Sequence, residues 1–164
     1  MKDEEDFLEY ALKSGRVRPV EEAFEEYPVE EEDHKGNAYY YVNEENEEYN
    51  KYSVGDIVFV RNYKYKDGKE GKDHLFVIIE KNKLLIPIEY LSMLISSNID
   101  KLKYESNKLL KKDENNKLKK DSIVKTDVIY TITENQILFK IGHVDIEQVE
   151  AYKDFFKKHK NIFK

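Results

Sequence analysis

The sequence contains no cysteine and no tryptophan, and it has only three prolines and six glycines among its 164 residues. Without cysteine the chain can form neither disulfides nor thiolate metal sites, and it has no thiol nucleophile. No apolar run approaches the roughly 20 residues that a membrane-spanning helix needs. The first ten residues, MKDEEDFLEY, are acidic where a signal peptide would be basic and then apolar. We therefore expect a cytoplasmic protein that does not associate with membranes.

Phosphate-binding glycine loops and metal-binding histidine pairs are also missing. Neither G-x-x-x-x-G-K-[ST] nor G-x-G-x-x-G occurs, which disfavours the nucleotide-hydrolysing classes. The four histidines are widely spaced, and none belongs to an H-x-H or H-x-x-x-H pair: His34, His74, His143 and His159. We expect neither a metal site nor a cofactor.

The net charge of −6 conceals two segments of opposite sign. Residues 1–50 carry 17 acidic and 5 basic side chains, whereas residues 51–164 carry 17 acidic and 23 basic ones. A chain of this length is suited to one main core. We therefore expect an acidic N-terminal extension, 1–50, attached to a basic domain, 51–164, whose charge suits a phosphate backbone. A solvated acidic tail is the alternative interpretation.

Two amphipathic patterns predict short helices inside the acidic extension. Residues 3–13 place apolar side chains along one stripe, with acidic residues in the first turn and Gly15 just beyond the end. Residues 19–27 form a second stripe, with Pro19 at the first helical position. Two such stripes cannot make a core alone. We expect them to dock on the basic domain, to bind a partner, or to become ordered only on contact.

From Tyr52 onward the pattern is that of β-strands and a closing helix. Runs of β-branched and aromatic residues predict strands within 54–61, 74–80, 83–91, 122–132 and 135–144. The lysine-rich residues 100–121 are expected to form an exposed connection with a helical start. Residues 145–159 predict a terminal helix, with Asp145 as N-cap and Gln148 in a capping box. The chain is therefore expected to be mainly β with α, a small antiparallel β-barrel with a C-terminal helix.

Four segments in this order resemble the MazF/PemK-like toxin family of small ribosome-independent endoribonucleases. VGDIVFVRNYKYKDGKEG is similar to the family's opening strand and loop, and KDHLFVII to its second strand. LISSNIDK is similar to the strand end that carries a small hydroxyl residue, and LKKDSIVKTDVIYTI to the segment leading into a late strand and the closing helix. The resemblance covers about residues 54–156.

The resemblance implies an SH3-like β-barrel with helices attached, usually a homodimer, with a groove that holds single-stranded RNA. In this family the 2′-hydroxyl of the RNA attacks the adjacent phosphate and leaves a 2′,3′-cyclic phosphate without a metal. Such a reaction needs a group that transfers a proton and a donor or cation that stabilises charge on the phosphate oxygens.

The resemblance also indicates catalytic positions. The family's hydroxyl residue falls on Ser96, with Ser97 beside it as a second donor to a phosphate oxygen. The family's catalytic arginine falls on Asp73 and His74. A histidine can act as acid or base near neutral pH, so His74 could replace the arginine. The alternative is that His74 only caps the strand and that the barrel lacks nuclease activity.

Basic residues near these positions are candidates for contacts with RNA. Lys72 or Arg61 could supply the positive charge beside His74, and Lys125 follows a turn near the same face. Lys64 lies in the loop 62–73, where tyrosines alternate with cations, a pattern that stacks bases and pairs with phosphates. An exposed hairpin and a polar edge strand would show the same residues without RNA contact.

Two functions follow from these observations. The first is an RNA-binding toxin-type protein that cleaves single-stranded RNA through Ser96 and His74, and the second is a non-catalytic interaction or regulatory protein that uses the same barrel. An antitoxin partner is implied by the resemblance. The acidic residues 1–50 could take that role within the chain by covering the RNA groove, or they could recruit a separate protein.

Overall fold

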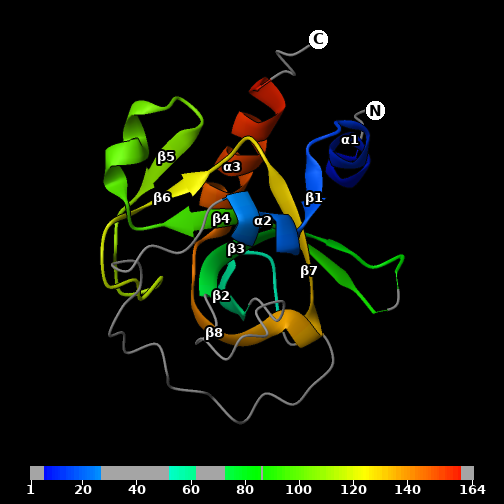
Figure 1. Cartoon of the computed structure of the whole chain (residues 1–164), viewed down its shortest axis with the longest axis horizontal. Coiled ribbons are helices and arrows are strands. Elements are labelled where there is room, and N and C mark those ends of the chain that lie inside the picture. The colour runs from blue at the N-terminus through cyan, green and yellow to red at the C-terminus, as the bar shows by residue number, and fades with distance from the viewer. Residues whose placement is uncertain (1–5, 27–51, 62–72, 86, 160–164) are drawn as a thin grey trace.

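The computed structural model describes residues 6–26, 52–61, 73–85 and 87–159, which Figure 1 shows as a coloured ribbon. In these residues the helices are α1 (Phe7–Lys13), α2 (Val20–Glu26), α3 (Ile146–Lys158) and the 3-10 helices η1 (Ile99–Lys103) and η2 (Glu134–Gln136). The strands are β1 (Val17–Pro19), β2 (Asp56–Arg61), β3 (Asp73–Asn82), β4 (Glu89–Ser96), β5 (Asn107–Leu110), β6 (Ser122–Lys125), β7 (Ile129–Thr133) and β8 (Ile137–His143).

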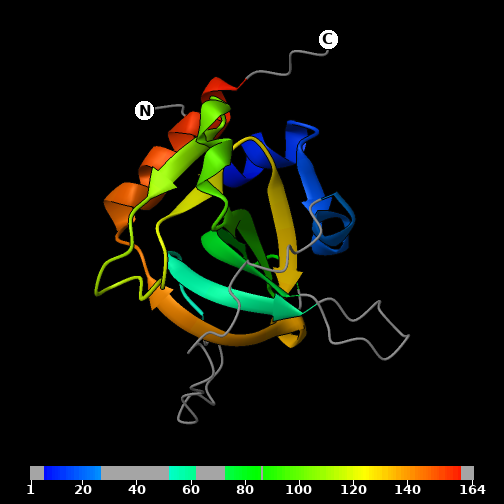
Figure 2. The same ribbon diagram turned by 60° about the vertical axis from the view of Figure 1, so that its left-hand side comes forward.

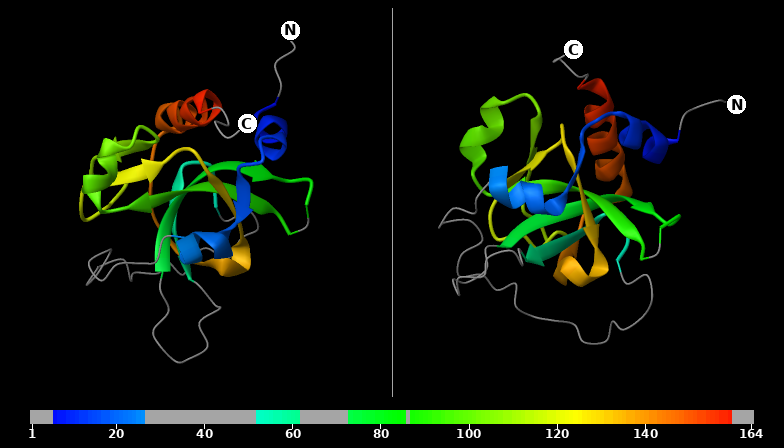
Figure 3. Two further views of the ribbon diagram at one scale, coloured as in Figure 1. Left: turned by 45° about the horizontal axis from the view of Figure 1, so that its top comes forward. Right: turned by 45° about the vertical axis from the view of Figure 1, so that its right-hand side comes forward.

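One mixed sheet contains all the strands of the described residues. Its main path runs β1-β7-β4-β3-β2-β8, and all its pairs are antiparallel except that of β1 with β7. Strand β4 pairs with β7 along its first half and with β6 along its second half, and β5 pairs with β6. The sheet curls strongly, as Figure 3 shows, which confirms the expected mainly β fold with a C-terminal helix.

Alternating residues along the strands fill two hydrophobic clusters, one on each face of the sheet. On β3, Leu75 and Val77 belong to the cluster that includes residues of α1 and α3, and we call this the α3-side face. Phe76 and Ile78 belong to the cluster that includes residues of α2, and we call this the α2-side face. Helices α2 and α3 accordingly lie on opposite sides of the curled sheet (Figure 3). Because successive side chains of a strand point to opposite faces, the same strand contributes residues to both hydrophobic clusters.

The N-terminal segment 6–26 docks on the barrel, which was one of the three expectations for it. Ala11 and Ala23 are fully buried, and Val20 is nearly so. Between the two helices, β1 adds a short parallel strand to the edge of β7. The prediction that Pro19 begins a helix was wrong, because Pro19 ends β1 and the helix follows it. Residues 27–51 lie outside the described residues.

The Arg16 side chain binds two parts of the chain that are distant from this segment in the sequence. Its guanidinium donates to the backbone carbonyls of Asp127, at 3.3 Å, and Phe156, at 3.0 Å. The same group lies 4.0 Å above the centre of the Phe156 ring, a favourable cation–π position. Burial lowers the pKa of Arg16. A partly desolvated cation held by two carbonyls therefore links the N-terminal segment, α3 and the corner between β6 and β7.

Two of the strand predictions had the wrong boundaries. The strand expected at 83–91 is β4, which begins only at Glu89, because the Asn82 side chain accepts from the backbone N–H of Leu84 and turns the chain outward. Leu84 is 86% exposed as a result. The strand expected at 122–132 is two strands, β6 and β7, which pair with different halves of β4.

The lysine-rich connection 100–121 contains more structure than its composition indicates. It holds most of η1 and the whole of β5, whose pairing with β6 carries Asn107 and Leu110 into the interior.

At the start of α3 the N-cap prediction is confirmed, since the Asp145 carboxylate accepts from the backbone N–H of Gln148 at 3.2 Å. The Gln148 side chain instead donates to the Tyr152 hydroxyl at 3.3 Å.

We predict that Arg16→Met destabilises the protein by about 2 kcal/mol, because it removes charged hydrogen bonds to two carbonyls. Arg18→Met is the matched control, since the Arg18 side chain makes a partly exposed ion pair with Glu22 at 3.9 Å. The control should change the free energy of unfolding by no more than about 0.5 kcal/mol. Urea unfolding of both variants measures the difference, and equal effects would contradict the role assigned to Arg16.

Candidate functional site

The strand register brings two of the predicted catalytic positions to the same end of the sheet. His74 on β3 pairs with Val60 on β2, and Ser96 on β4 pairs with Ile123 on β6. Leu75 on β3 pairs with Ile95 on β4, and the two strands are antiparallel. The residue before Leu75, His74, therefore faces the residue after Ile95, Ser96. Residues that oppose one another across strands share a face. His74 and Ser96 therefore lie in one row on the α2-side face.

The His74 side chain is buried. It is only 2% exposed, and its ring meets that of Phe76 edge-on, with 6.3 Å between centroids and an interplanar angle of 87°. Phe76 itself is fully buried in the cluster that α2 covers. His74 therefore belongs to the interior of the α2-side face, and an RNA phosphate could contact it only if the covering residues moved.

Ser96 ends its strand and is partly exposed. Its Oγ accepts a hydrogen bond from the backbone N–H of Asn98 at 3.1 Å, and the Asn98 side chain in turn accepts from the N–H of Asp100 at the start of η1. Since the Ser96 hydroxyl is an acceptor in this contact, its own proton can still be donated to another oxygen. Ser97 follows directly and is also partly exposed.

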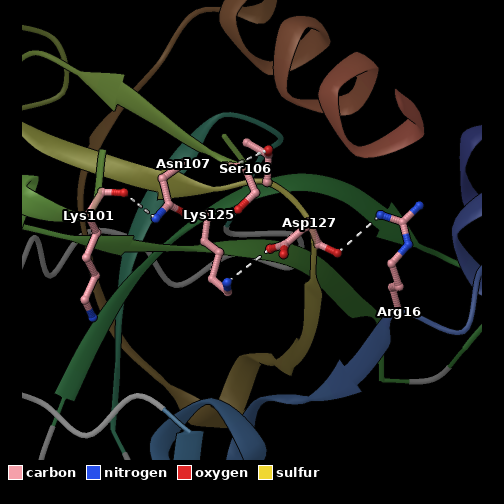
Figure 4. A network of polar contacts seen from close by, with 7 residues as sticks. Arg16, Lys101, Ser106, Asn107, Lys125 and Asp127 are labelled. Atoms are coloured by element: carbon pink, nitrogen blue, oxygen red, sulfur yellow. Dashed lines mark hydrogen bonds and ion pairs between the residues drawn. The ribbon is translucent and has the colours of Figure 1, made fainter. Parts of the chain in front are cut away.

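Lys125 lies on the same face as Ser96 but is held in an ion pair. It stands two residues after Ile123 on β6, and its Nζ lies 3.2 Å from Oδ1 of Asp127, with 17% of the side chain exposed. Figure 4 shows this pair within a polar network that runs from Lys101 to Arg16. In the same corner Thr126 is fully buried and donates to the Ser106 carbonyl at 2.7 Å. The polar residues at the end of β6 and after it, Lys125, Thr126 and Asp127, are therefore used in contacts within the protein.

The remaining predicted RNA-binding residues cannot be placed in the site. The backbone of Arg61 pairs with that of Asp73 at the ends of β2 and β3, next to the His74 row. The side chain of Arg61 lies outside the described part of the structure, as do Lys64 and Lys72. Their roles remain predictions.

A second polar cluster, which sequence reasoning missed, lies at the other end of β2. Asp56 as a whole residue is 1% exposed, and its carboxylate accepts from the backbone N–H of Ser53 at 2.8 Å. Its Oδ1 lies 2.9 Å from Nδ1 of His143 and 3.2 Å from Nζ of Lys140. Figure 2 shows β2 and β8 running side by side, and Asp56 pairs with His143 in their register. The Gly55-Asp56 pair is a turn signal in the sequence at the start of β2, but only long-range pairing reveals the partners of Asp56.

Gly55 allows the His143 ring to approach the backbone. Its φ is +98°, and a Cβ built there would lie 2.5 Å from the Val144 carbonyl oxygen and 2.7 Å from Cε1 of His143. Glycine adopts this backbone conformation readily, and any other residue would also collide with the imidazole. The His143 ring is therefore held between Gly55 and Asp56.

Burial also affects the tyrosines close to Asp56. It raises the pKa of Tyr52 and of Tyr90, whose rings pack edge-on with centroids 5.9 Å apart. The hydroxyls of Tyr52 and Tyr90 therefore favour the neutral form and add no second negative charge near Asp56. The positive charge that compensates the Asp56 carboxylate comes from Lys140 and, when it is protonated, from His143.

We predict that Gly55→Ala is more destabilising than Gly15→Ala by about 2 kcal/mol. Gly15 also has a positive φ, +78°, but a Cβ there would meet nothing within 4 Å. Both variants introduce the same kind of backbone strain, of about 1 kcal/mol, and only Gly55→Ala adds a collision. Urea unfolding measures the free energy of unfolding of both variants. Equal destabilisation would show that the collision of a Cβ at residue 55 with Val144 and His143 costs no free energy.

Neither a metal cluster nor a membrane helix is found among the described residues. No group of three or more His, Asp or Glu side chains there could hold a metal ion. Within the same ranges no helix is long and apolar enough to cross a membrane.

A protein-family model matches the greater part of the chain. The model of a family described as the PemK-like, MazF-like toxin of type II toxin-antitoxin system matches residues 53–158. This range contains every described strand except β1, together with α3. No curated protein matches the chain. The segment with α1, β1 and α2 lies outside the matched range, although it shares the core.

Proposed function

The chain belongs to the PemK-like, MazF-like toxins of type II toxin-antitoxin systems, and from this premise we propose that it binds and cleaves single-stranded RNA. The observation that carries the proposal is the row in which His74 and Ser96 stand on neighbouring strands at one end of the sheet. In the sequence resemblance, Ser96 falls on the family's hydroxyl residue, and His74 stands where the family carries its catalytic arginine. An antitoxin as partner and RNA as substrate are what the family implies in general.

The proposed reaction uses the RNA's own 2′-hydroxyl and needs no metal. Its oxygen attacks the adjacent phosphorus, the bond to the 5′-oxygen breaks, and a 2′,3′-cyclic phosphate and a 5′-hydroxyl are formed. Ser96, supported by Ser97, donates to a phosphate oxygen, and His74 takes part in proton transfer. The basic residues hold the phosphates, and they are Arg61, Lys64, Lys72 and Lys125.

This reaction requires two rearrangements on the α2-side face. His74 is 2% exposed and must become accessible before it can reach an RNA atom. Lys125 must exchange its pair with Asp127 for a phosphate. The burial of His74 is the specific observation that favours the second candidate function, a non-catalytic interaction protein that retains the family barrel.

The test uses the full chain, because the segment 6–26 contributes buried residues to the core. The protein is incubated with single-stranded RNA in the presence of a chelator, and the products are analysed for cyclic-phosphate ends. We predict cleavage, with a loss of about 10²-fold or more in Ser96→Ala and in His74→Gln. His159→Ala, at the end of α3, is the control that should cleave as the parent does.

Absence of cleavage by the folded parent would favour the non-catalytic candidate. Cleavage that persists in both Ser96→Ala and His74→Gln would keep the nuclease function and remove these two residues from its site. A thermal unfolding curve for each variant shows whether a loss of activity is only a loss of folding.

The acidic residues of the N-terminal extension are proposed to compete with RNA for the basic domain. Residues 27–50 carry eight acidic side chains and one basic side chain, whereas residues 51–164 carry a net charge of +6. Attachment to the same chain gives such a segment an effective concentration of about 1 mM, so weak contacts suffice. The alternative is that this extension recruits a separate protein.

We predict that replacing the run Glu30–Asp33 by three glutamines and one asparagine increases RNA affinity at low salt. The gain should shrink as salt is added, because screening weakens the competing charges. A variant that keeps the charge, with aspartates at 30–32 and glutamate at 33, is the control. Fluorescence anisotropy with labelled RNA measures both, and equal affinities at every salt concentration would favour recruitment of a partner.

A further inference from the structure

The Lys125 side chain lies within reach of a phosphate bound at Ser96. Ser96 on β4 pairs with Ile123 on β6, and Lys125 stands two residues further along β6. Such diagonal neighbours on adjacent strands lie about 7–8 Å apart, a distance that a long side chain spans. A phosphate that accepts a hydrogen bond from Ser96 can therefore also contact the ammonium group of Lys125.

A carboxylate of the same chain already pairs with this ammonium group. Nζ of Lys125 lies 3.2 Å from Oδ1 of Asp127, and 17% of the lysine side chain and 33% of the aspartate side chain are exposed. Oδ1 of Asp127 is buried and accepts no hydrogen bond of regular geometry from any described residue. The pair therefore depends on charge attraction, which an RNA phosphate can also supply.

The N-terminal segment fixes the backbone of Asp127. The Arg16 guanidinium donates to the Asp127 carbonyl at 3.3 Å and, from its other terminal nitrogen, to the Phe156 carbonyl at 3.0 Å. Figure 4 shows the contacts that lead from Arg16 through Asp127 to Lys125. Arg16 lies outside the range that matches the family. A carboxylate is thus held beside Lys125 by a part of the chain that the family domain does not include.

We infer that Asp127 competes with the RNA phosphate for Lys125 and thereby weakens the binding of RNA to this chain. The inference rests on the proposed function and adds a residue that opposes substrate binding at the same site. When RNA binds, a phosphate displaces the carboxylate, and the Lys125 ammonium contacts a phosphate oxygen. Because Asp127 belongs to the same chain, it competes at every protein concentration.

A purely structural role would use the same pair. The contact joins the end of β6 to the corner before β7, so its loss can loosen that corner. The two roles differ in the sign of one effect. Loss of a competing carboxylate strengthens RNA binding, whereas loss of a support for Lys125 weakens it or leaves it unchanged.

The test measures the affinity of the full-length chain for labelled single-stranded RNA with fluorine in place of each 2′-hydroxyl, which removes the attacking group. We expect Asp127→Asn to bind about fivefold more tightly than the parent at an ionic strength of about 0.1 M. The slope of log affinity against log salt should become steeper by up to about 0.7, because no unpaired carboxylate is left when Lys125 neutralises a phosphate.

Two further variants separate competition from a general effect of charge. Asp154→Asn removes the same charge from an exposed position on α3, on the opposite side of the sheet from α2, and should change the affinity by no more than about twofold. Lys125→Gln removes the ammonium for which the carboxylate and the phosphate compete. In the Lys125→Gln background, Asp127→Asn should therefore have no larger effect than Asp154→Asn.

The parent protein supplies a second measurement that does not depend on how well Asp127→Asn folds. The carbon-13 chemical shift of the Asp127 carboxylate should move when RNA is added, because Lys125 leaves it. A shift that stays constant up to saturation with RNA contradicts the exchange.

The affinities have four decisive outcomes. A gain in Asp127→Asn that disappears with Lys125→Gln supports the inference. Affinity equal to or below that of the parent in folded Asp127→Asn overturns it, although the proposed function stands. A gain that persists with Lys125→Gln, or that Asp154→Asn reproduces, assigns the effect to net charge and also overturns it. Absence of RNA binding by the folded parent and by Asp127→Asn alike contradicts the proposed function itself.

Discussion

The buried carboxylate of Asp56 is the constraint on which the junction of β2 with β8 depends. A charge that is 1% exposed is strongly unfavourable unless donors surround it, and here the Ser53 N–H, Lys140 and His143 provide them. The donors come from the turn before β2 and from β8. Satisfying one carboxylate therefore fixes the start of β2 against the end of β8. Gly55 makes this possible, because only a residue without a side chain leaves room for the imidazole.

The N-terminal segment shows how a family domain can incorporate sequence from outside its own range. Residues 53–158 match the family, yet Ala11 and Ala23 are fully buried in the clusters that this range builds. Arg16 holds the Asp127 carbonyl, and the Asp127 carboxylate holds Lys125. The position of a proposed phosphate-binding lysine thus depends on an arginine that the family match does not include. The segment 6–26 is accordingly a part of this barrel and not only an appendage.

Local sequence pattern predicted most strands and the closing helix, because alternation and capping act between neighbouring residues. Asp145 as N-cap and the strand through Phe76 are examples. Strand β1 could not be predicted in this way, since its three residues form a strand only through pairing with Ile129 and its neighbours, more than a hundred residues away. Strand β5 was missed because its lysines suggested an exposed segment, although pairing with β6 buries Asn107 and Leu110.

The candidate site shows the same limit. The family resemblance indicated the strand positions of His74 and Ser96, but it could not indicate that His74 is buried and packs edge-on against Phe76, because both depend on the tertiary structure. His143 carries no local signal at all, because its partner Asp56 is 87 residues away in the chain. A lone histidine near the end of a strand acquires chemical meaning only when the register sets a buried carboxylate opposite it.

The nitrogen-15 chemical shifts of the His143 ring give the most direct test of this arrangement. In the neutral imidazole, a proton on Nδ1 and a bare, basic Nε2 are predicted, because the Asp56 carboxylate can only accept from Nδ1. Replacement of Asp56 by asparagine should allow the proton to move to Nε2. A neutral His143 that already carries its proton on Nε2 in the parent protein would contradict the pairing of its Nδ1 with Asp56, and with it the contact that joins β2 to β8.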